Sequence, residues 1–455
     1  MPAPPDPAGP DPARPAGPVA RESHLQEVSR PEYGFQDNPA AAGAAAFTRM
    51  WGDLAGVGWH PGTGGYRRFA WTREDAELRE WFTGEAAARG LDVVDDRAGN
   101  LWAWSGDPDK ALTDGAGPGV VLGSHLDSVP DGGAFDGPLG VVSALAAVDA
   151  LRHSGFTPAR PLGVALFGDE EGARFGVACA GSRLLTGALA ADRARGLTDA
   201  DGVSMAEALT RAGRDPGRLG RDEETLRRVG TFVELHVEQG RGLDRLDRAV
   251  GVGSGIWPHG RWRIELPGEA NHAGTTALDD RHDAMVTFAS AVLAARGSAT
   301  WHDALATCGK VVVAPNGVNA IPSRVTAWLD ARAPRADAVR AVVEEVAGVV
   351  QVHGGTVTEE SWTDRTAFDA GLAERLAALL GPPGNPAPLL ATGAGHDAGI
   401  LAAAGVPTAM LFVRNPTGIS HSPAENAERD DCLTGVEALT AVAAELAGAR
   451  PEPGG

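Results

Sequence analysis

The sequence predicts an α/β protein, a mixed sheet with helices on both faces into which a smaller β-α-β-β-α-β unit is inserted. Two observations support this prediction. Short apolar runs alternate with helical patterns over most of the chain, and this rhythm changes between about residues 251 and 364. The length of 455 residues agrees with two domains, because one domain typically has about 100 to 200 residues.

The main sheet is predicted from four apolar runs, each followed by polar residues. A strand that is buried on both faces has a continuous hydrophobic sequence, which is typical of parallel strands between helices. The runs lie at residues 119–123, 162–167, 231–235 and 406–413, and helical patterns lie at 141–153, 397–404 and 433–446. This alternation indicates an α/β sheet with helices on both faces.

The inserted unit is predicted from the order of its elements. Strands are expected at 261–266, 309–314, 324–332 and 356–362, and helices at 281–295 and 336–352. That order is the split β-α-β-β-α-β arrangement. We therefore expect one discontinuous domain over 41–250 and 364–450 and a second domain over 251–363. A disordered Pro- and Ala-rich tail is expected over 1–40, without the apolar segment of a signal peptide.

Composition and charge narrow the range of partners. A formal net charge of −20 disfavours nucleic acid, because binding to phosphates relies on clustered Lys and Arg. No apolar run approaches the ~20 residues that span a bilayer, so no membrane contact is expected. Cys179, Cys308 and Cys432 lie far apart without metal-ligand spacing, which predicts neither a disulfide framework nor a thiolate zinc site. This composition predicts a reducing, cytoplasmic location.

Residues that can bind metal follow the predicted strands of the main sheet. In open α/β sheets, ligands bind beyond the carboxyl ends of the strands. These segments contain His125, Asp127, Asp136, Glu170, Glu171, His236, Gln239 and His421. Any one of them alone is more often a solvated or core residue, but their joint occurrence at four strand ends favours a metal site. Imidazole and carboxylate ligands suit Zn²⁺ or Mn²⁺.

The positions of these residues suggest separate roles. If two ions are present, one carboxylate must bridge them, and Asp136 is the candidate because its flanking glycines let the backbone turn sharply. Asp127, two residues after His125, is placed to hold that imidazole from behind. Consecutive side chains point in different directions, so one of Glu170 and Glu171 is expected to bind metal and the other to transfer protons.

Several competing catalytic motifs do not occur in the sequence. It contains no His-Glu-x-x-His zinc helix, no Gly-x-Ser-x-Gly nucleophile elbow and no phosphate-binding loop. The Gly-rich fragment 251–255 is not a dinucleotide-binding motif, because no strand is followed by Gly-x-Gly-x-x-Gly and a later acidic residue. Metal-assisted hydrolysis is therefore the leading prediction.

In these motifs the chain resembles the amidase, hydantoinase and carbamoylase family of dinuclear metallohydrolases, which contains allantoate amidohydrolase, N-carbamoyl-L-amino-acid hydrolase and β-ureidopropionase. The resemblance extends from about residue 47 to residue 446. Its motifs, in family order, are Gly-Ser-His-Leu-Asp-Ser-Val-Pro, Asp-Glu-Glu-Gly-Ala-Arg-Phe, Glu-Leu-His-Val-Glu-Gln-Gly, Ala-Asn-His-Ala-Gly-Thr-Thr, Gly-His-Asp-Ala and Ile-Ser-His-Ser-Pro. The resemblance implies a zinc-exopeptidase-like fold whose inserted domain is a lid and dimerisation domain.

The resemblance also implies a cofactor and a catalytic group. It assigns one divalent ion to His125, Asp136 and His236, and a second to Asp136, Glu171 and His421. The ions would be Zn²⁺ or Mn²⁺, with Co²⁺ as an alternative. Glu170 becomes the general base, with Asp127 behind the metal site. His272 is similar to the family histidine that reaches across a homodimer interface to stabilise the developing oxyanion.

Substrate contacts are implied at Gln239, Asn319, Arg332, His396 and Gly418. Arg332 is the expected partner of a substrate carboxylate, because a guanidinium can pair with it bidentately. The chain departs from the usual family pattern at residues 275–278, Thr-Thr-Ala-Leu, and at residues 412–417, Phe-Val-Arg-Asn-Pro-Thr. Both departures leave the metal ligands intact but bear on which substrate is bound.

The leading functional hypothesis is an amidohydrolase that cleaves a C–N bond of allantoate or an N-carbamoyl-L-amino acid with a metal-activated water. A second hypothesis keeps the chemistry but changes the substrate to an N-formyl or N-acyl amino acid such as formylglutamate, because Arg414 adds a cation near the site. A third is a catalytically silent metal-binding relative. Glu170 argues against the third, because such a relative needs no second acid beside a metal ligand.

Overall fold

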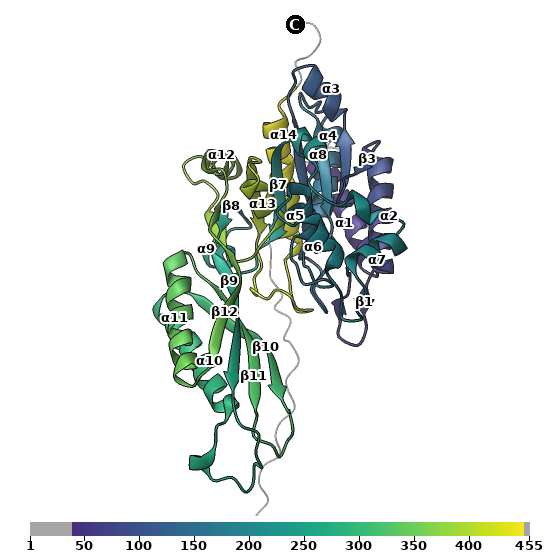
Figure 1. The fold of residues 1–455 in the computed structure, drawn as a ribbon. Helices are drawn as coiled ribbons and strands as arrows, with labels where there is room; N and C mark the ends of the chain where they lie inside the picture. The colour runs from purple at the N-terminus through teal and green to yellow at the C-terminus, as the bar shows by residue number, and fades with distance from the viewer. Residues whose placement is uncertain (1–38, 450–455) are drawn as a thin grey trace, which may run out of the picture. The chain divides into compact units, whose positions relative to one another are not determined.

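The computed structural model describes residues 39–449, and the largest sheet in this part of the chain has nine strands (Figure 1). The strand order is β13-β8-β15-β7-β5-β6-β4-β3, with β14 paired to β8. The strands are β3 (Asp92–Asp95), β4 (Leu101–Ser105), β5 (Gly119–His125), β6 (Leu162–Phe167), β7 (Val229–Val237), β8 (Val250–Ile256), β13 (Thr366–Ala367), β14 (Leu389–Thr392) and β15 (Thr408–Val413).

The centre of this sheet is parallel and its flanks are antiparallel. Strands β15, β7, β5 and β6 run parallel to one another, whereas β8 beside β15 and β4 beside β6 are antiparallel. The four predicted apolar runs form the parallel centre, because only central strands must be hydrophobic on both faces. The predicted mixed α/β sheet is confirmed.

Alternate side chains of the central strands enter two different cores. Val120 and Leu122 of β5 pack with helices α1 (Pro39–Leu54), α4 (Pro138–His153) and α14 (Arg429–Ala447). Val121 belongs to a second core with residues of α5 (Ala180–Thr186) and α13 (Asp397–Ala403). Successive residues of a strand point to opposite faces, so helices cover both faces of the sheet.

Of the predicted tail over residues 1–40, residues 1–38 lie outside the described part of the chain. Pro39 already begins helix α1, so the boundary at residue 40 is slightly too late. Helix α1 buries Phe47, Met50 and Leu54, at a spacing of three and four residues that forms one apolar face. These side chains join the core that contains α4.

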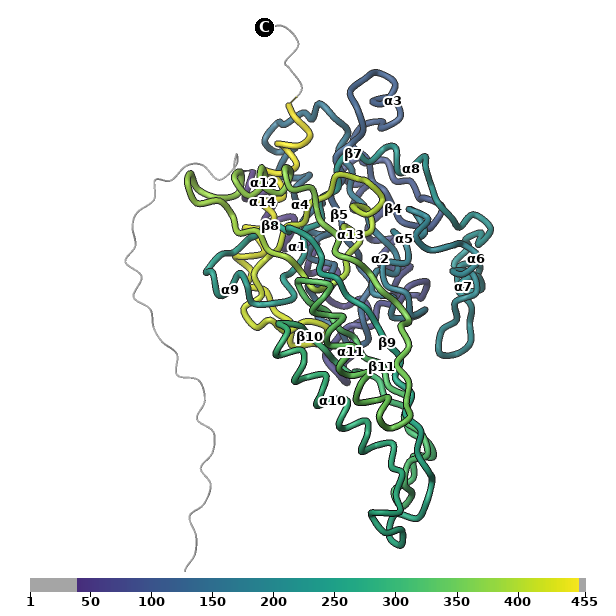
Figure 2. Tube along the Cα trace, turned by 60° about the vertical axis from the view of Figure 1, so that its left-hand side comes forward, coloured from purple at the N-terminus to yellow at the C-terminus, as the bar shows by residue number. Residues whose placement is uncertain are grey.

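A separate four-stranded antiparallel sheet, in the order β10-β11-β9-β12, lies between β8 and β13 in the chain. Its elements are β9 (His259–Pro267), α10 (Ala284–Trp301), β10 (Leu305–Ala314), β11 (Arg324–Arg332), α11 (Ala336–Val352) and β12 (Thr356–Thr363), the predicted β-α-β-β-α-β order. Both helices pack on the same sheet face in one hydrophobic core (Figure 2). Strand β11 alternates buried and partly exposed residues, as expected for a sheet covered on one side.

The start of the inserted unit is a correction to the sequence analysis. Strand β8, inside the segment 251–363 that was assigned to the second domain, pairs with β15 and β14 of the main sheet. Its sequence is rich in glycine, so local propensity did not predict a strand. The second sheet therefore begins at β9.

The remaining elements are short or lie at the edges of the main sheet. They are β1 (Trp59–His60), β2 (Gly65–Tyr66), α2 (Arg73–Ala88), α3 (Pro108–Thr113), α6 (Ala191–Gly196), α7 (Met205–Arg211), η1 (Pro216–Arg218), α8 (Glu223–Arg228), α9 (Gly242–Leu246), η2 (Leu278–Asp280) and α12 (Ala370–Leu380). In the described part of the chain, no helix combines the length and apolarity needed to cross a bilayer.

Candidate metal centre

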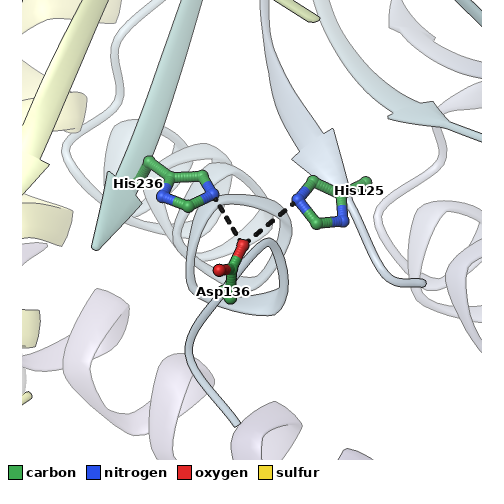
Figure 3. A group of neighbouring side chains, drawn as sticks. All are labelled: His125, Asp136 and His236. Carbon is green, nitrogen blue, oxygen red and sulfur yellow. Dashed lines mark ion pairs between the residues drawn. The ribbon is translucent and has the colours of Figure 1, made fainter. Parts of the chain in front are cut away.

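Asp136 lies at the centre of the candidate site, between two buried histidines (Figure 3). His125 is the last residue of β5, and His236 lies near the end of β7, the parallel neighbour of β5. Their Nε2 atoms lie 3.6 and 3.2 Å, respectively, from Oδ1 of Asp136. Parallel neighbouring strands end at one edge of the sheet, and this brings both imidazoles to one carboxylate oxygen. We call these three residues the first ligand set.

The loop that carries Asp136 requires glycine where it passes His125. Gly137 has a φ of +87°, and a Cβ atom at this position would lie 2.4 Å from Cε1 of His125. A left-handed backbone and so close an approach both exclude larger residues. Helix α4 begins at the next residue, Pro138. The Gly-rich loop thus makes the sharp turn that was expected of it.

Both histidines of the first ligand set present an unpaired nitrogen to Asp136. Nδ1 of His125 hydrogen-bonds to the main-chain oxygen of Asp127 at 3.1 Å, and Nδ1 of His236 to that of Val237 at 2.9 Å. Because Nδ1 then carries the proton, the Nε2 lone pair is available to a cation. Both Nε2 atoms are buried without a hydrogen-bond partner, which fits a metal ligand.

A second ligand set lies on the other side of the same carboxylate. Nε2 of His421 is 3.6 Å from Oδ2 of Asp136 and 3.6 Å from Oε2 of Glu171. Asp136 therefore presents Oδ1 to the first set and Oδ2 to the second. This is the arrangement needed for a carboxylate that bridges two ions.

The electrostatics of the site also fit bound cations. Burial and, after it, the nearby carboxylate of Asp136 raise the pKa of Glu171 to about 8. Burial likewise raises the pKa of Glu170 well above its ordinary value, although His125 opposes the shift. Placing several carboxylates together in a buried site is costly unless positive charge compensates them. Divalent ions would supply that charge.

Glu170 lies beside the first ligand set but belongs to neither set. Its Oε2 atom is 3.7 Å from Nε2 of His125, and its Oε1 accepts a hydrogen bond from Sγ of Cys179 at 3.3 Å. A carboxylate held next to the ligands, but not among them, is suited to proton transfer.

Asp127 supports the site differently from the expectation. The hydrogen bond from His125 goes to its main-chain oxygen, while its carboxylate oxygen Oδ1 lies 3.5 Å from Nδ1. The carboxylate accepts the N–H groups of Glu170 and Glu171 at 3.2 and 3.0 Å. Asp127 therefore fixes the turn on which both glutamates stand.

A family model described as peptidase family M20/M25/M40 matches residues 121–445. The chain belongs to this family. The N-carbamoyl-L-amino acid amidohydrolase of Geobacillus stearothermophilus is 36% identical over 414 residues, which are 86% of this chain and 96% of the relative. The allantoate amidohydrolase of Escherichia coli strain K12 is 31% identical over 393 residues, which are 84% of this chain and 93% of the relative.

A crystal structure of an amidase of the hydantoinase/carbamoylase family from Burkholderia vietnamiensis has the same fold. The TM-score is 0.78 at 29% identity, and the match covers 89% of this chain and 97% of that chain. The family resemblance found in the sequence is confirmed, and with it the class of amidohydrolases that act on C–N bonds other than peptide bonds.

Gln239, expected to contact the substrate, hydrogen-bonds directly to the candidate metal centre. Its Nε2 donates to Oδ2 of Asp136 at 2.9 Å and to Oγ of Ser420 at 3.0 Å. His396, another expected substrate contact, is only 2% exposed, and its ring packs against His236 at 4.5 Å between centroids. Gly418 adopts a φ of +67° in the loop before His421.

Arg332 lies at the end of β11 with much of its guanidinium already paired. Nε and Nη2 donate to the two carboxylate oxygens of Asp330 at 2.7 and 3.0 Å, and Nη1 donates to the main-chain oxygen of Gly393 at 2.7 Å. Asp330 takes the Nε/Nη2 edge, so a substrate carboxylate would have to approach the Nη1/Nη2 end.

His272 and Asn319 lie together in two adjoining loops of the second sheet. The N–H of Ala273 donates to the main-chain oxygen of Asn319 at 2.9 Å. Nδ1 of His272 accepts the N–H of Gly274 at 2.9 Å, so a neutral ring carries its proton on Nε2 and can donate it outward. In residues 39–449, the hydrogen bonds of His272 remain within its own loop.

Arg414 does not serve the role that motivated the formylglutamate hypothesis. Nε and Nη2 pair with the carboxylate of Asp431 at 2.7 and 2.9 Å, and Nη1 pairs with Asp247 at 2.9 Å. The hydrogen bond to Asp431 raises the pKa of Arg414. A free cation was expected here because both partners of Arg414 lie elsewhere in the chain. Arg414 instead joins the β15 end to helix α14.

We expect Arg414→Ala to lower stability without changing substrate preference. The buried Asp431 carboxylate would lose its bidentate partner, at a cost of about 1 to 3 kcal/mol. Thermal or urea unfolding measures the loss, and kcat/KM on several substrates tests the preference. A selective loss on doubly acidic substrates would return Arg414 to the substrate pocket.

Glu234 is a site residue that the sequence analysis did not assign. It is fully buried, its Oε1 accepts Oγ–H of Ser124 at 2.8 Å, and its Oε2 accepts the N–H of Ala398 at 2.9 Å. It stands two residues before His236 in β7, and residues i and i+2 of a strand share a face. This spacing of two residues is the sequence signal that could have identified Glu234 as a neighbour of His236.

Proposed function

We propose that this chain is a two-metal amidohydrolase that cleaves a C–N bond of a ureido or carbamoyl carboxylic acid, such as allantoate or an N-carbamoyl-L-amino acid. The observation that carries the proposal is Asp136, which directs one oxygen to each ligand set while Glu170 stands beside them. The activities for which the relatives are named, allantoate amidohydrolase and N-carbamoyl-L-amino acid amidohydrolase, support the substrate class.

The proposed mechanism assigns each group one task. The first ligand set would hold one divalent ion and the second set another, Zn²⁺ or Mn²⁺, with Co²⁺ as an alternative. Such ions, when bound, polarise the scissile carbonyl and acidify a water molecule. Glu170 accepts a proton from the attacking water and returns it to the departing nitrogen as the C–N bond breaks. Cys179 holds the other oxygen of Glu170, which keeps the carboxylate oriented.

Substrate recognition is proposed to depend on Arg332. Its Nη1/Nη2 end would pair with the substrate carboxylate, while Asp330 keeps the guanidinium in place. Gln239, Asn319, His396 and Gly418 would contact the polar groups of the substrate or shape its pocket. The alternative formylglutamate substrate is not favoured, because Arg414 is engaged by Asp431 and Asp247.

The substrate proposal is tested by kcat/KM on allantoate, N-carbamoyl-alanine, N-carbamoyl-aspartate and formylglutamate, with Zn²⁺ or Mn²⁺ added. We expect ammonia from the ureido or carbamoyl substrates to exceed formate from formylglutamate. Arg332→Ala should lose about 1.5 to 3 kcal/mol of transition-state binding, the usual contribution of a hydrogen bond to a charged group, because its side chain is 28% exposed. Faster formate release would refute the substrate class, and undiminished activity of Arg332→Ala would refute the carboxylate contact.

We further propose a homodimer in which the second sheet contributes to the partner's site. Strand β10 is an unpaired edge of that sheet in the described residues, and edges of this kind can pair with another chain. The outer side of α10 exposes Val286, Leu293 and Trp301 at 64%, 71% and 85%. Their spacing of about two helical turns forms an apolar face suited to an interface. His272, which is exposed and whose Nδ1 accepts a hydrogen bond so that Nε2 carries the proton, would then donate to the developing oxyanion in the other subunit.

The dimer proposal predicts complementation between two inactive variants. His272→Ala and Glu170→Gln chains should each have strongly reduced activity as homodimers, whereas a heterodimer would contain one site with both residues intact. We expect partial recovery of activity after subunit exchange, measured on a purified heterodimer with two different tags. No recovery in a verified heterodimer would rule out a shared site.

We also propose a cytoplasmic location and a limited set of partners. All three cysteines, which lie in the described part of the chain, are free thiols, as a reducing cytoplasm would maintain them. The formal net charge of −20 disfavours nucleic acid as a partner, and no membrane partner is proposed. The proposed partners are thus a small carboxylate substrate and a second copy of the chain.

A further inference from the structure

We propose that Glu425 is a positioning residue that clamps together the loops carrying Asp136 and His421 and thereby sets the metal affinity of the second ligand set. This inference rests on the two-metal function proposed above. Glu425 is only 5% exposed and lies four residues after His421. No role was assigned to it from the sequence.

The contacts of Glu425 join the two loops directly. Its Oε2 accepts the N–H groups of Phe135 and Asp136 at 2.9 and 3.1 Å. Its own N–H donates to the main-chain oxygen of Ser422 at 3.0 Å, next to His421. One carboxylate oxygen of Glu425 therefore fixes the peptide N–H groups of Phe135 and Asp136. The backbone of Glu425 is at the same time hydrogen-bonded within the turn that follows His421.

The packing around Glu425 leaves little room for the loops to shift. A Cβ atom at Gly133 would lie 2.3 Å from Oε2 and 2.5 Å from Cβ of Glu425. Separations below 3 Å require the neighbouring atoms to move. Glu425 cannot move easily, because its Oε2 atom and its backbone N–H are both hydrogen-bonded. Glycine is thus required at position 133 by the close approach of Glu425.

The two ligand sets differ in how much they depend on this clamp. His125 and His236 lie on strands β5 and β7, whose positions are fixed by ladder hydrogen bonds. His421 lies on a loop with a left-handed φ of +55°, and its 3.6 Å distance to Asp136 joins two loops. Loosening the clamp should therefore weaken the second ligand set more than the first.

Glu425 is a positioning residue and not a ligand, because its hydrogen bonds go to main-chain N–H groups. Loss of a group that orients metal ligands typically weakens metal affinity by about 10- to 100-fold. For Glu425→Ala we expect this loss for the second Zn²⁺ bound, with the first Zn²⁺ little affected. Glu425→Gln retains an oxygen acceptor for Phe135 and Asp136 and should recover most of the affinity.

Gly133→Ala tests the same clamp from the opposite side. The added methyl group displaces Glu425, so this variant alone should weaken the second Zn²⁺. In a Glu425→Gly background the methyl group has space, because the Cβ atom of residue 425 is removed together with the carboxylate. Gly133→Ala should therefore add little to Glu425→Gly, so the effects of the two substitutions should not be additive. Glu428→Gln is the control, because it removes an exposed charge three residues away that does not contact the Asp136 loop.

The experiment counts Zn²⁺ per chain by mass spectrometry after dialysis of the holoenzyme against chelator-buffered Zn²⁺, with circular dichroism to verify folding. If Glu425→Ala does not fold, Gly133→Ala and Glu425→Gln still provide the test. Unchanged affinity for the second Zn²⁺ in folded Glu425→Ala or Gly133→Ala would overturn the inference. The inference would also be overturned if Glu425→Gln bound the second Zn²⁺ as weakly as Glu425→Ala, because the loss of affinity would then come from the lost charge and not from the lost hydrogen bonds. A parent enzyme that binds no Zn²⁺ and no Mn²⁺ would instead refute the two-metal function, and the inference would fall with it.

Discussion

Glu170→Gln should retain both metal ions and lower kcat by about 10² to 10⁴, the range typical of a lost general base. Gln has nearly the same shape as Glu, and its carbonyl oxygen can still accept the hydrogen bond from Cys179. It cannot take up a proton at the oxygen that lies 3.7 Å from Nε2 of His125. Metal content by mass spectrometry and kcat at saturating substrate provide the two measurements.

Glu171→Gln is the matched control, since it makes the same change at the next residue. Oε2 of Glu171 lies 3.6 Å from Nε2 of His421 within the second ligand set. We expect this variant to lose affinity for one ion, and added metal should restore part of its activity. Added metal should not restore Glu170→Gln. Parent-like turnover in Glu170→Gln would show that the base is another group.

The parallel centre of the main sheet could be predicted because its sequence signal is local. Strands β6 and β11 and helix α11 have the predicted bounds, and each has a clear apolar pattern. Strand β8 could not be predicted in this way. Its glycines carry no hydrophobic pattern, and its pairing with β15 depends on residues about 160 positions away. Tertiary pairing, not local propensity, makes that segment a strand.

The candidate site also contains residues that could be predicted from local sequence and contacts that could not. Placement at the carboxyl ends of parallel strands was enough to predict a metal site that includes His125, Asp136 and His236, and the family resemblance grouped these three as one ligand set. The true partners of Arg414 were not predictable, because Asp431 and Asp247 lie 17 and 167 residues away. The sequence likewise contains no signal that a carboxylate four residues after His421 would bond to the main chain at Asp136. Such contacts follow from the folded chain alone.

Asp136, the proposed bridging carboxylate, is the residue whose loss should have the largest effect, because it belongs to both ligand sets. Oδ1 of Asp136 faces His125 and His236, and Oδ2 faces His421. In Asp136→Asn one oxygen is replaced by an NH₂ group, which cannot bind a cation. Whichever oxygen is replaced, one ligand set loses its carboxylate oxygen, and the charge that both sets share is removed. The buried imidazoles then face a neutral amide.

Asp136→Asn should therefore lower the affinity for both ions and reduce activity by more than the about 10² to 10⁴ expected of Glu170→Gln. Removal of metal from the parent with a chelator should cause a similar loss that Zn²⁺ or Mn²⁺ reverses, whereas the variant should not recover. Asp131→Asn is the control in the same loop, because Asp131 pairs with Arg67 and belongs to neither ligand set. We expect parent-like metal content for it. An Asp136→Asn enzyme with two tightly bound ions, or a metal-free parent with full activity, would contradict the bridging role.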